Sequence, residues 1–170
     1  NLLKRNLASE FEIKDLGHLK YFLGMEVARS KEGIVISQRK YILDLLKETV
    51  RLGWKPTETP MDPNKKACNR EEQTPVNKER YQRLVGKLIY LSHTHPGIAY
   101  SVSIVSQHMN EPTEGDLEVV NRILRYLKMT PGLGLLFKKT NTRDFQVYTD
   151  ASWAGKETYR KSTTGYCSYV

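Results

Sequence analysis

The chain is poor in cysteine and has no long apolar run, and these absences exclude two classes of protein. Its two cysteines, Cys68 and Cys167, lie far apart and form no CxxC pair. They indicate neither a disulfide framework nor a zinc site, and a reduced, intracellular setting fits them. No apolar stretch reaches the length of about 20 residues that spans a bilayer, and residues 1–5 (NLLKR) are no signal peptide. We therefore expect a protein of the cytoplasm or nucleus that is not secreted and has no membrane partner.

Clustered acidic residues are missing as well, although one aspartate stands in a suggestive place. Asp150 lies in the sequence YTDASWAG, residues 148–155, at the end of a segment in which polar and apolar side chains alternate. Metal-dependent phosphodiester cleavage uses two cations about 4 Å apart, held by several acidic side chains from different elements. A solitary carboxylate binds Mg²⁺ weakly, so Asp150 alone does not form such a site. The alternative is an aspartate that caps a turn before Ala151 and Ser152, and we favour this structural role for the chain as given.

Positive charge is abundant but spread along the chain. The formal net charge is +8 and the pI is near 9.4, which favours an anionic partner such as a nucleic acid. Residues 1–66 carry 13 basic and 9 acidic side chains, residues 67–139 carry 10 and 7, and residues 140–170 carry 4 and 3. Because no segment concentrates the charge, composition supports weak, salt-sensitive binding to phosphates. The pair His93 and His95 has no cysteine nearby and is more typical of a helix end than of a metal site.

The first third of the sequence predicts a short helix, a β-hairpin and a second helix. Apolar residues at spacing four, ended by residues 15–17, indicate the first helix. Residues 19–27 and 34–36 favour strands, and Gly33 lies in the turn that joins them. Ser37 is expected to cap the second helix, and Gly53 to close it. The residues that define the sides of the two helices are Leu3, Leu7 and Phe11, and then Tyr41, Ile42, Leu45, Leu46 and Glu48.

Four prolines between residues 55 and 78 interrupt a polar stretch, which predicts a linker without regular structure. Three helices follow, and their apolar stripes can pack against one another as a small helical subdomain. In the third, Thr113 and Asp116 form a capping-box-like pair at the start, and Pro131 stops the helix. Tyr90 and Tyr126 are expected in the core. The stripes consist of Tyr81, Leu84, Val85, Leu88 and Leu91, of Ile98, Val102, Val105 and Met109, and of Leu117, Val120, Leu124 and Leu127.

The end of the sequence returns to β character. Residues 135–137 favour a strand, and residues 145–149 alternate in the way that suits a strand with one buried face. Residues 165–170 indicate the beginning of a second strand.

In this order, the segments resemble the carboxy-terminal half of the reverse transcriptase region of a copia-type long-terminal-repeat retrotransposon polyprotein. The resemblance runs nearly end to end, and it is specific because several short motifs occur in register. The motifs are FEIKDLG at residues 11–17, YFLGMEV at 21–27, TPM at 59–61, YQRLVGKLIYL at 81–91, ILRYLK at 123–128, YTDASWAG at 148–155 and RKSTTG at 160–165.

The resemblance implies an α+β fold with three regions. Residues 1–66 would hold the last helix of the polymerase palm, a hairpin similar to the primer grip, and a thumb-like helix with a linker. Residues 67–139 would form a three-helix thumb or connection region, and residues 140–170 the first strands of an RNase H-like sheet. In that family the polymerase aspartates stand in a Tyr-x-Asp-Asp turn upstream of the first helix, and no such tetrad occurs in these 170 residues. Asp150 matches the first acid of the RNase H set, whose other acids belong to later elements.

The sequence departs from the family pattern in two places. The stretch usually written Thr-Arg-Pro-Asp reads THPG at residues 94–97, which removes a possible ion pair and an acidic helix cap. Ser152 stands where an aspartate is common, and Lys156 replaces another frequent acid. These changes fit neutral variation as well as the decay of a degenerate element copy.

We expect the chain to help position a primer-template duplex and to be inactive alone. Its candidate phosphate contacts are Lys20, Arg39, Lys40 and Lys47, although exposed cations on amphipathic helices usually only face solvent. Mg²⁺ would serve the intact enzyme, with Asp150 as one weak ligand, and no cofactor is expected for the chain by itself. The expected partners are an RNA/DNA or DNA duplex and the remainder of the polyprotein. The alternatives are a non-catalytic basic nucleic-acid-binding module and a functionless helical remnant of a degenerate element.

Overall fold

The computed structural model describes residues 2–14, 17–49, 53–62, 74–140, 145–152 and 162–169. The chain has the mixed α+β composition that the sequence predicts, and it packs as two compact units, Asn1–Phe137 and Lys138–Val170. The second unit contains β5 (Gln146–Ser152) and β6 (Thr163–Tyr169).

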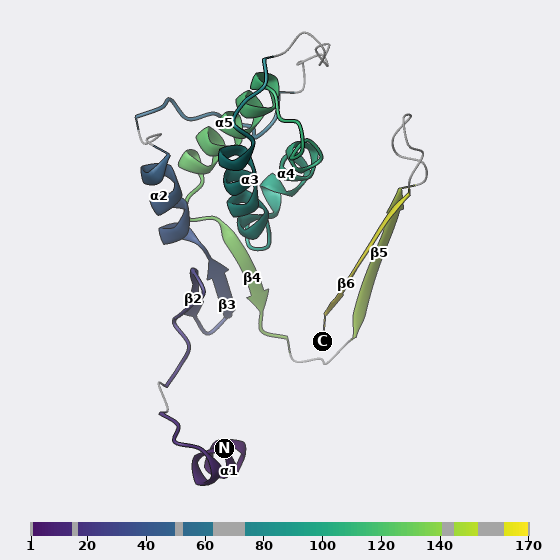
Figure 1. Ribbon diagram of the computed structural model, residues 1–170. Coiled ribbons are helices and arrows are strands. Elements are labelled where there is room, and N and C mark those ends of the chain that lie inside the picture. Colours follow the sequence, from purple (N-terminus) through teal and green to yellow (C-terminus); the bar gives the residue numbers. More distant parts are fainter. Residues whose placement is uncertain are drawn as a thin grey trace. The chain divides into compact units, whose positions relative to one another are not determined.

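None of the helices in the described ranges is long and apolar enough to cross a bilayer. The elements before β5 are α1 (Leu2–Glu10), β1 (Tyr21–Phe22), β2 (Met25–Arg29), β3 (Gly33–Ser37), α2 (Arg39–Glu48), α3 (Lys78–Ser92), the 3₁₀ helix η2 (Pro96–Ile98), α4 (Ala99–Ser106), α5 (Glu114–Met129) and β4 (Gly134–Lys138) (Figure 1).

Some predictions fall on residues outside the described ranges. They are Cys68, the middle of the predicted linker at residues 63–73, and Lys156. The predicted stop of the first helix at residues 15–17 is wrong, because α1 ends at Glu10.

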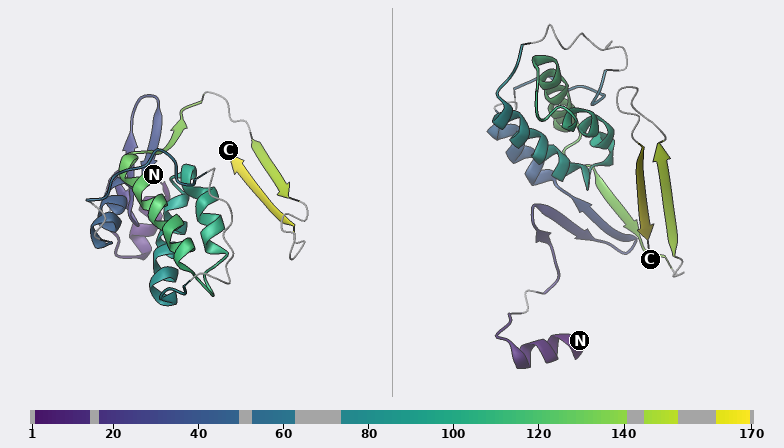
Figure 2. Two further views of the ribbon diagram at one scale, coloured as in Figure 1. Left: turned by 90° about the horizontal axis from the view of Figure 1, so that it is seen from above. Right: turned by 45° about the vertical axis from the view of Figure 1, so that its right-hand side comes forward.

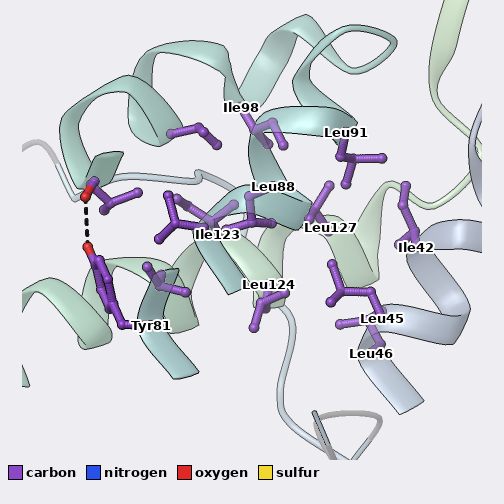
Figure 3. Packing of buried hydrophobic residues seen from close by; sticks show 14 residues of the cluster. Ile42, Leu45, Leu46, Tyr81, Leu88, Leu91, Ile98, Ile123, Leu124 and Leu127 are labelled. Carbon is purple, nitrogen blue, oxygen red and sulfur yellow. Dashed lines mark hydrogen bonds between the residues drawn. The ribbon is translucent and has the colours of Figure 1, made fainter. Parts of the chain in front are cut away.

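Helices α2 to α5 and η2 enclose one hydrophobic core, and both views in Figure 2 show the helices as one group. The three apolar stripes predicted from residue 81 onward supply most of it, and the three predicted helices are present. The second is shorter than its stripe predicts, because Ile98 belongs to η2 and Met109 follows the end of α4. Figure 3 shows the side chains converging, with the Tyr81 hydroxyl donating a hydrogen bond to the Val105 carbonyl at 2.8 Å. The core consists of Ile42, Leu45, Leu46, Tyr81, Val85, Leu88, Leu91, Ile98, Val102, Val105, Val120, Ile123, Leu124 and Leu127.

Helix α2 belongs to this core, although the sequence places it in a different region from α3, α4 and α5. Its Ile42, Leu45 and Leu46 are each at most 3% exposed. The predicted boundary between residues 66 and 67 therefore does not separate two hydrophobic cores. The assignment of the three regions to palm, thumb and RNase H parts stays a prediction.

Strands β1, β2, β3 and β4 form a sheet in that order. Strands β2 and β3 pair antiparallel, with Val27 opposite Ile36, which confirms the predicted hairpin. The predicted strand over residues 19–27 is wrong in one respect, because Leu23 and Gly24 turn the chain between β1 and β2. The predicted strand at residues 135–137 is confirmed as β4, and its place beside β3 was not predicted.

The predicted start of helix α2 is wrong. The residue that caps the helix is Gln38 instead of Ser37, and its side chain makes no capping hydrogen bond. The backbone N–H of Lys40 donates instead to the Glu26 carboxylate on β2 at 2.8 Å. A carboxylate from the hairpin thus satisfies one of the N–H groups that the first helical turn leaves without an intrahelical partner.

The predicted end of helix α2 is also wrong. The helix ends at Glu48, several residues before Gly53. Thr49 closes it, because the Thr49 backbone N–H and hydroxyl both donate to the Leu45 carbonyl, at 3.0 and 2.8 Å.

The described part of the predicted linker before residue 63 accepts hydrogen bonds from helix α5. The Arg125 side chain donates through Nε to the Lys55 carbonyl at 2.7 Å, and Arg122 donates in the same way to the Thr59 carbonyl at 3.2 Å. The prolines do predict the absence of regular structure, but arginine side chains from α5 supply the hydrogen bonds that a helix or strand would otherwise make.

The predicted capping pair of helix α5 is confirmed. One oxygen of the Asp116 carboxylate accepts the backbone N–H of Thr113 at 3.0 Å and its hydroxyl at 2.9 Å. The helix ends at Met129, before Pro131, as predicted.

Both predicted strands of the second unit are confirmed. Strands β5 and β6 pair antiparallel over seven residues, from Gln146 opposite Tyr169 to Ser152 opposite Thr163. Every side chain of β5 is exposed, so the strand has no buried face in the described unit, contrary to the prediction from its alternation.

Candidate nucleic-acid surface

The turn between β1 and β2 presents apolar side chains to solvent. Tyr21, Phe22 and Leu23 are 51%, 53% and 66% exposed. Leu23 has a φ of 48° and Gly24 a φ of 82°, so two successive residues take the left-handed conformation. Leucine rarely adopts it, because its Cβ crowds the backbone there. A strained turn that exposes aromatic rings is unusual for a feature that serves stability alone.

One of the predicted cations lies directly beside this turn. The Lys40 ammonium is 5.8 Å from the centre of the Tyr21 ring, within the range of a cation–π contact. Lys20 immediately precedes Tyr21, and Arg39 immediately precedes Lys40 at the start of α2. The structure therefore brings Lys40 next to the segment that carries Lys20, and it leaves all three cationic side chains exposed.

Lys47 lies farther along helix α2. It follows Lys40 by seven residues, so the two lysines share one exposed face and are about 10 Å apart along the helix axis. Asp44 stands between them on the same face and reduces the local positive charge. The surface defined by Tyr21, Phe22, Leu23, Lys40 and Lys47, called here the hairpin–α2 surface, is thus partly aromatic and only moderately basic.

Asp150 belongs to the second unit. It lies inside strand β5 opposite Gly165, and the strand continues through Ser152, so the predicted role as a turn cap is wrong. In the part of the chain that the structure describes, no three acidic, histidine or cysteine side chains gather into a group that could hold a metal ion. The described donors therefore do not fit the two-cation site that the resemblance implies, and the assignment of Asp150 as a metal ligand stays a prediction.

The two histidines of the HxH pair have separate roles. His93 caps the end of helix α3, as the sequence predicts for a histidine at a helix end. His95 is 2% exposed, and its Nε2 lies 3.1 Å from the Thr130 hydroxyl oxygen. The His95 ring also packs edge-on against Tyr126, with 5.8 Å between ring centres. These contacts join the start of η2 to the end of α5.

Burial lowers the pKa of His95, and its hydrogen bond to Thr130 opposes this only in part. The unfolded chain, in which histidine titrates near its ordinary pKa of about 6.5, therefore binds more protons than the folded chain just below that pH. We expect the free energy of unfolding to fall by up to about 1.4 kcal/mol per pH unit as the pH drops from about 6.5 toward the folded pKa. Urea unfolding at neutral and mildly acidic pH measures this.

His95→Gln should flatten that pH dependence, because glutamine does not titrate. His18→Gln is the matched control, since His18 is exposed, and it should keep the wild-type dependence. Equal acid sensitivity in His95→Gln and the wild type would contradict the assignment of the effect to His95.

The sequence does not reveal one residue that contacts the turn of the hairpin–α2 surface from helix α3. The sequence predicts Tyr90 of helix α3 in the core, yet this residue is only half-buried and its hydroxyl donates to the Leu23 carbonyl. The one available signal was Gly24, because a glycine inside a segment rich in β-favouring residues points to a turn or a close approach. The sequence also predicts Tyr126 in the core, and this side chain is partly buried and packs against the hydrophobic core.

Comparison with known proteins finds close relatives of the sequence. The family described as "Reverse transcriptase (RNA-dependent DNA polymerase)" matches residues 1–63. The chain is 44% identical over 165 residues to the retrovirus-related Pol polyprotein from transposon RE1 of Arabidopsis thaliana, which is 97% of this chain and 11% of that protein. It is 37% identical over 173 residues to the corresponding polyprotein from transposon TNT 1-94 of Nicotiana tabacum, covering 96% of this chain and 13% of the relative.

A shorter relative is matched over most of its length. An uncharacterized mitochondrial protein of Arabidopsis thaliana is 38% identical over 170 residues, which is all of this chain and 70% of that protein. The chain thus spans only a small part of the Pol polyproteins but most of this relative. No solved structure matches the chain.

Proposed function

Because the chain belongs to the family of copia-type retrotransposon Pol polyproteins and carries reverse transcriptase sequence at residues 1–63, we propose that its hairpin–α2 surface helps to hold a primer-template duplex. The observation that supports this most is the contact of Lys40 with Tyr21. It combines a cation that can meet a phosphate with an aromatic ring that can stack on a base.

The surface suits weak, backbone-directed binding. Its lysines are exposed, and among the described residues neither Lys40 nor Lys47 forms an ion pair. Asp44 between them lowers the local potential, so contacts to a few phosphates are expected rather than a continuous basic track. We propose that this stretch contributes positioning and no catalysis, since its sequence has no Tyr-x-Asp-Asp tetrad.

The test is equilibrium binding of the purified chain to a fluorescent RNA/DNA or DNA duplex at several salt concentrations. Wild-type affinity should fall steeply as salt rises, because each neutralised phosphate releases counterions. The double variant Lys40→Glu with Lys47→Glu should bind about 10-fold more weakly at low salt and show a salt slope smaller by about two.

The matched control is Lys14→Glu with Lys31→Glu, which changes the net charge equally at two exposed lysines outside the surface. It should lose much less affinity. Affinity that stays flat between low and physiological salt would contradict the proposal, as would equal losses in the two double variants. Mg²⁺-dependent nucleotide incorporation by the purified chain would contradict the proposed lack of catalysis.

A further inference from the structure

Residues 53–62, called here the α5 strap, form no helix or strand and are bound by basic side chains of helix α5. The Lys128 ammonium donates to the Trp54 carbonyl at 2.8 Å, and Arg125 donates to the Lys55 carbonyl at 2.7 Å. Each of these bonds joins a cation to a neutral carbonyl group. Together with Arg122, the two side chains recur every third residue, so the strap lies along a row of positive charge.

Thr59 is a residue of the α5 strap whose side-chain oxygen meets one of these cations. Arg122 donates through Nε to the Thr59 carbonyl at 3.2 Å and through Nη2 to the Thr59 hydroxyl oxygen at 3.0 Å. The other terminal nitrogen, Nη1, donates to the Asp62 carboxylate at 3.3 Å. Thr59 is exposed, so an anionic group attached to its hydroxyl oxygen would have room in solvent and would stand directly beside a guanidinium.

Thr59 also precedes a proline, and Thr-Pro is the dipeptide that proline-directed protein kinases modify. The chain has two further Thr-Pro pairs, which begin at Thr74 and Thr130. The Thr130 side chain is half-buried, and its hydroxyl donates to the Tyr126 carbonyl at 3.1 Å. Thr74 is exposed, but among the described residues no basic side chain donates to its hydroxyl. Of the three threonines, Thr59 therefore combines an accessible hydroxyl with an arginine partner.

We propose that Thr59 is a phosphorylation site and that Arg122 binds the resulting phosphate. A phosphothreonine carries up to about two negative charges at neutral pH and accepts strong hydrogen bonds from guanidinium groups. Nη2 of Arg122 already donates to the oxygen that would carry the phosphate, so the first contact needs little rearrangement. Phosphorylation thus holds the α5 strap more tightly on the helix. Neither residue belongs to the hairpin–α2 surface, so the inference does not depend on duplex binding.

The modification is a phosphoryl transfer from ATP to Thr59. The Thr59 Oγ1 attacks the γ-phosphorus, and the new O–P bond forms as the bond between that phosphorus and the bridging oxygen of ADP breaks. ADP leaves with the electron pair of the broken bond, and the hydroxyl proton passes to a carboxylate of the kinase. The α5 strap must separate locally from the helix to enter the kinase, and a segment without helix or strand bonds opens at low cost.

The first test treats the full 170-residue chain with a purified mitogen-activated protein kinase, Mg²⁺ and ATP. All chains carry Thr74→Ala, which removes the other exposed Thr-Pro pair. Peptide mass spectrometry should find one phosphate on Thr59 and none on Thr130, and Thr59→Ala should abolish the product. A chain that stays unmodified at Thr59 would overturn the proposed site.

The second test measures the change in melting temperature that phosphorylation causes in each variant. It should be a rise of about 2–4 °C, which corresponds to roughly one additional charge-assisted hydrogen bond in a chain of this size. Arg122→Gln should still be phosphorylated but should lose the rise. Arg125→Gln is the matched control on the same helix and should keep it, because Arg125 binds the Lys55 carbonyl instead of Thr59. Comparing the two forms of one variant cancels the stability lost through the substitution itself.

Phosphorus NMR gives a readout that a purely structural role of Arg122 would not change. The guanidinium favours the dianionic phosphate, so the second ionisation of phosphothreonine 59 should have its midpoint at lower pH in the parent chain than in Arg122→Gln. Equal midpoints in the two chains would overturn the binding role of Arg122. A rise in melting temperature that Arg122→Gln retains would overturn it as well.

Discussion

Leu124→Ala is expected to lower the free energy of unfolding by about 2–5 kcal/mol, which is a large share of the stability of a domain of this size. Leu124 is completely buried in helix α5, among core side chains from α2 and α3 (Figure 3). Truncation removes buried methyl groups and leaves a cavity that packed helices fill only in part. Urea unfolding followed by circular dichroism gives the change in midpoint and shows whether the slope is kept.

The matched control is Leu43→Ala on helix α2. It makes the same substitution at a helical position where the side chain is 40% exposed, so the loss should be well below that of Leu124→Ala. Because α2 shares the core with α3 and α5, Leu124→Ala should unfold these helices in a single transition. A separate, unaffected transition for α2 would contradict the single core, and equal losses in the two variants would contradict the burial of Leu124.

The helices were predictable because their signals are local. An apolar stripe at spacings of three and four needs only one segment of sequence, and the stripes around Leu88, Val105 and Leu124 all correspond to buried faces. The capping pair of Thr113 and Asp116 spans three residues and was found for the same reason.

The errors arise where a distant segment supplies the partner. Ser37 has the right chemistry to cap helix α2, but the Glu26 carboxylate on β2 binds the Lys40 N–H instead. Prolines mark the segment after Gly53 as irregular, and nothing local reveals that arginines of α5 bind its carbonyl groups. Such contacts depend on which elements pack together, and a single sequence does not contain that information in local form.

In the candidate site, too, local features could be predicted from the sequence and contacts from distant segments could not. Lysines on an exposed helix face and the YTDASWAG motif at Asp150 can be read directly, but the left-handed φ of Leu23 cannot, because leucine gives no sign of it. Gly24 marks the turn, and only the structure identifies Tyr90 as its support. A prediction from sequence therefore names the charged groups of such a surface more readily than the residue that orients it.

Gly134→Ala is expected to displace strand β4 from β3 and to lower the free energy of unfolding by about 1–3 kcal/mol, as overpacking does. A Cβ at this position would lie 2.9 Å from the Ser37 Cβ and 3.0 Å from the Ile36 carbonyl carbon, and closer still to the Ile36 carbonyl oxygen. These atoms belong to the backbone of β3 or are attached to it directly, so no side-chain rotation relieves the clash. The strand itself must shift.

Hydrogen exchange measures that shift, because amides of β4 that pair with β3 should lose protection before the helical core does. Gly132→Ala is the matched control: its Cβ would meet nothing within 4 Å, so its effect should stay within about 0.5 kcal/mol. Since β4 follows α5 directly and β3 leads into α2, their pairing links the two ends of the helical unit to the hairpin. Gly134→Ala should therefore also speed up amide hydrogen exchange in residues 33–37 of β3. Amide exchange that stays slow in both β3 and β4 would contradict the close contact between Gly134 and the β3 backbone.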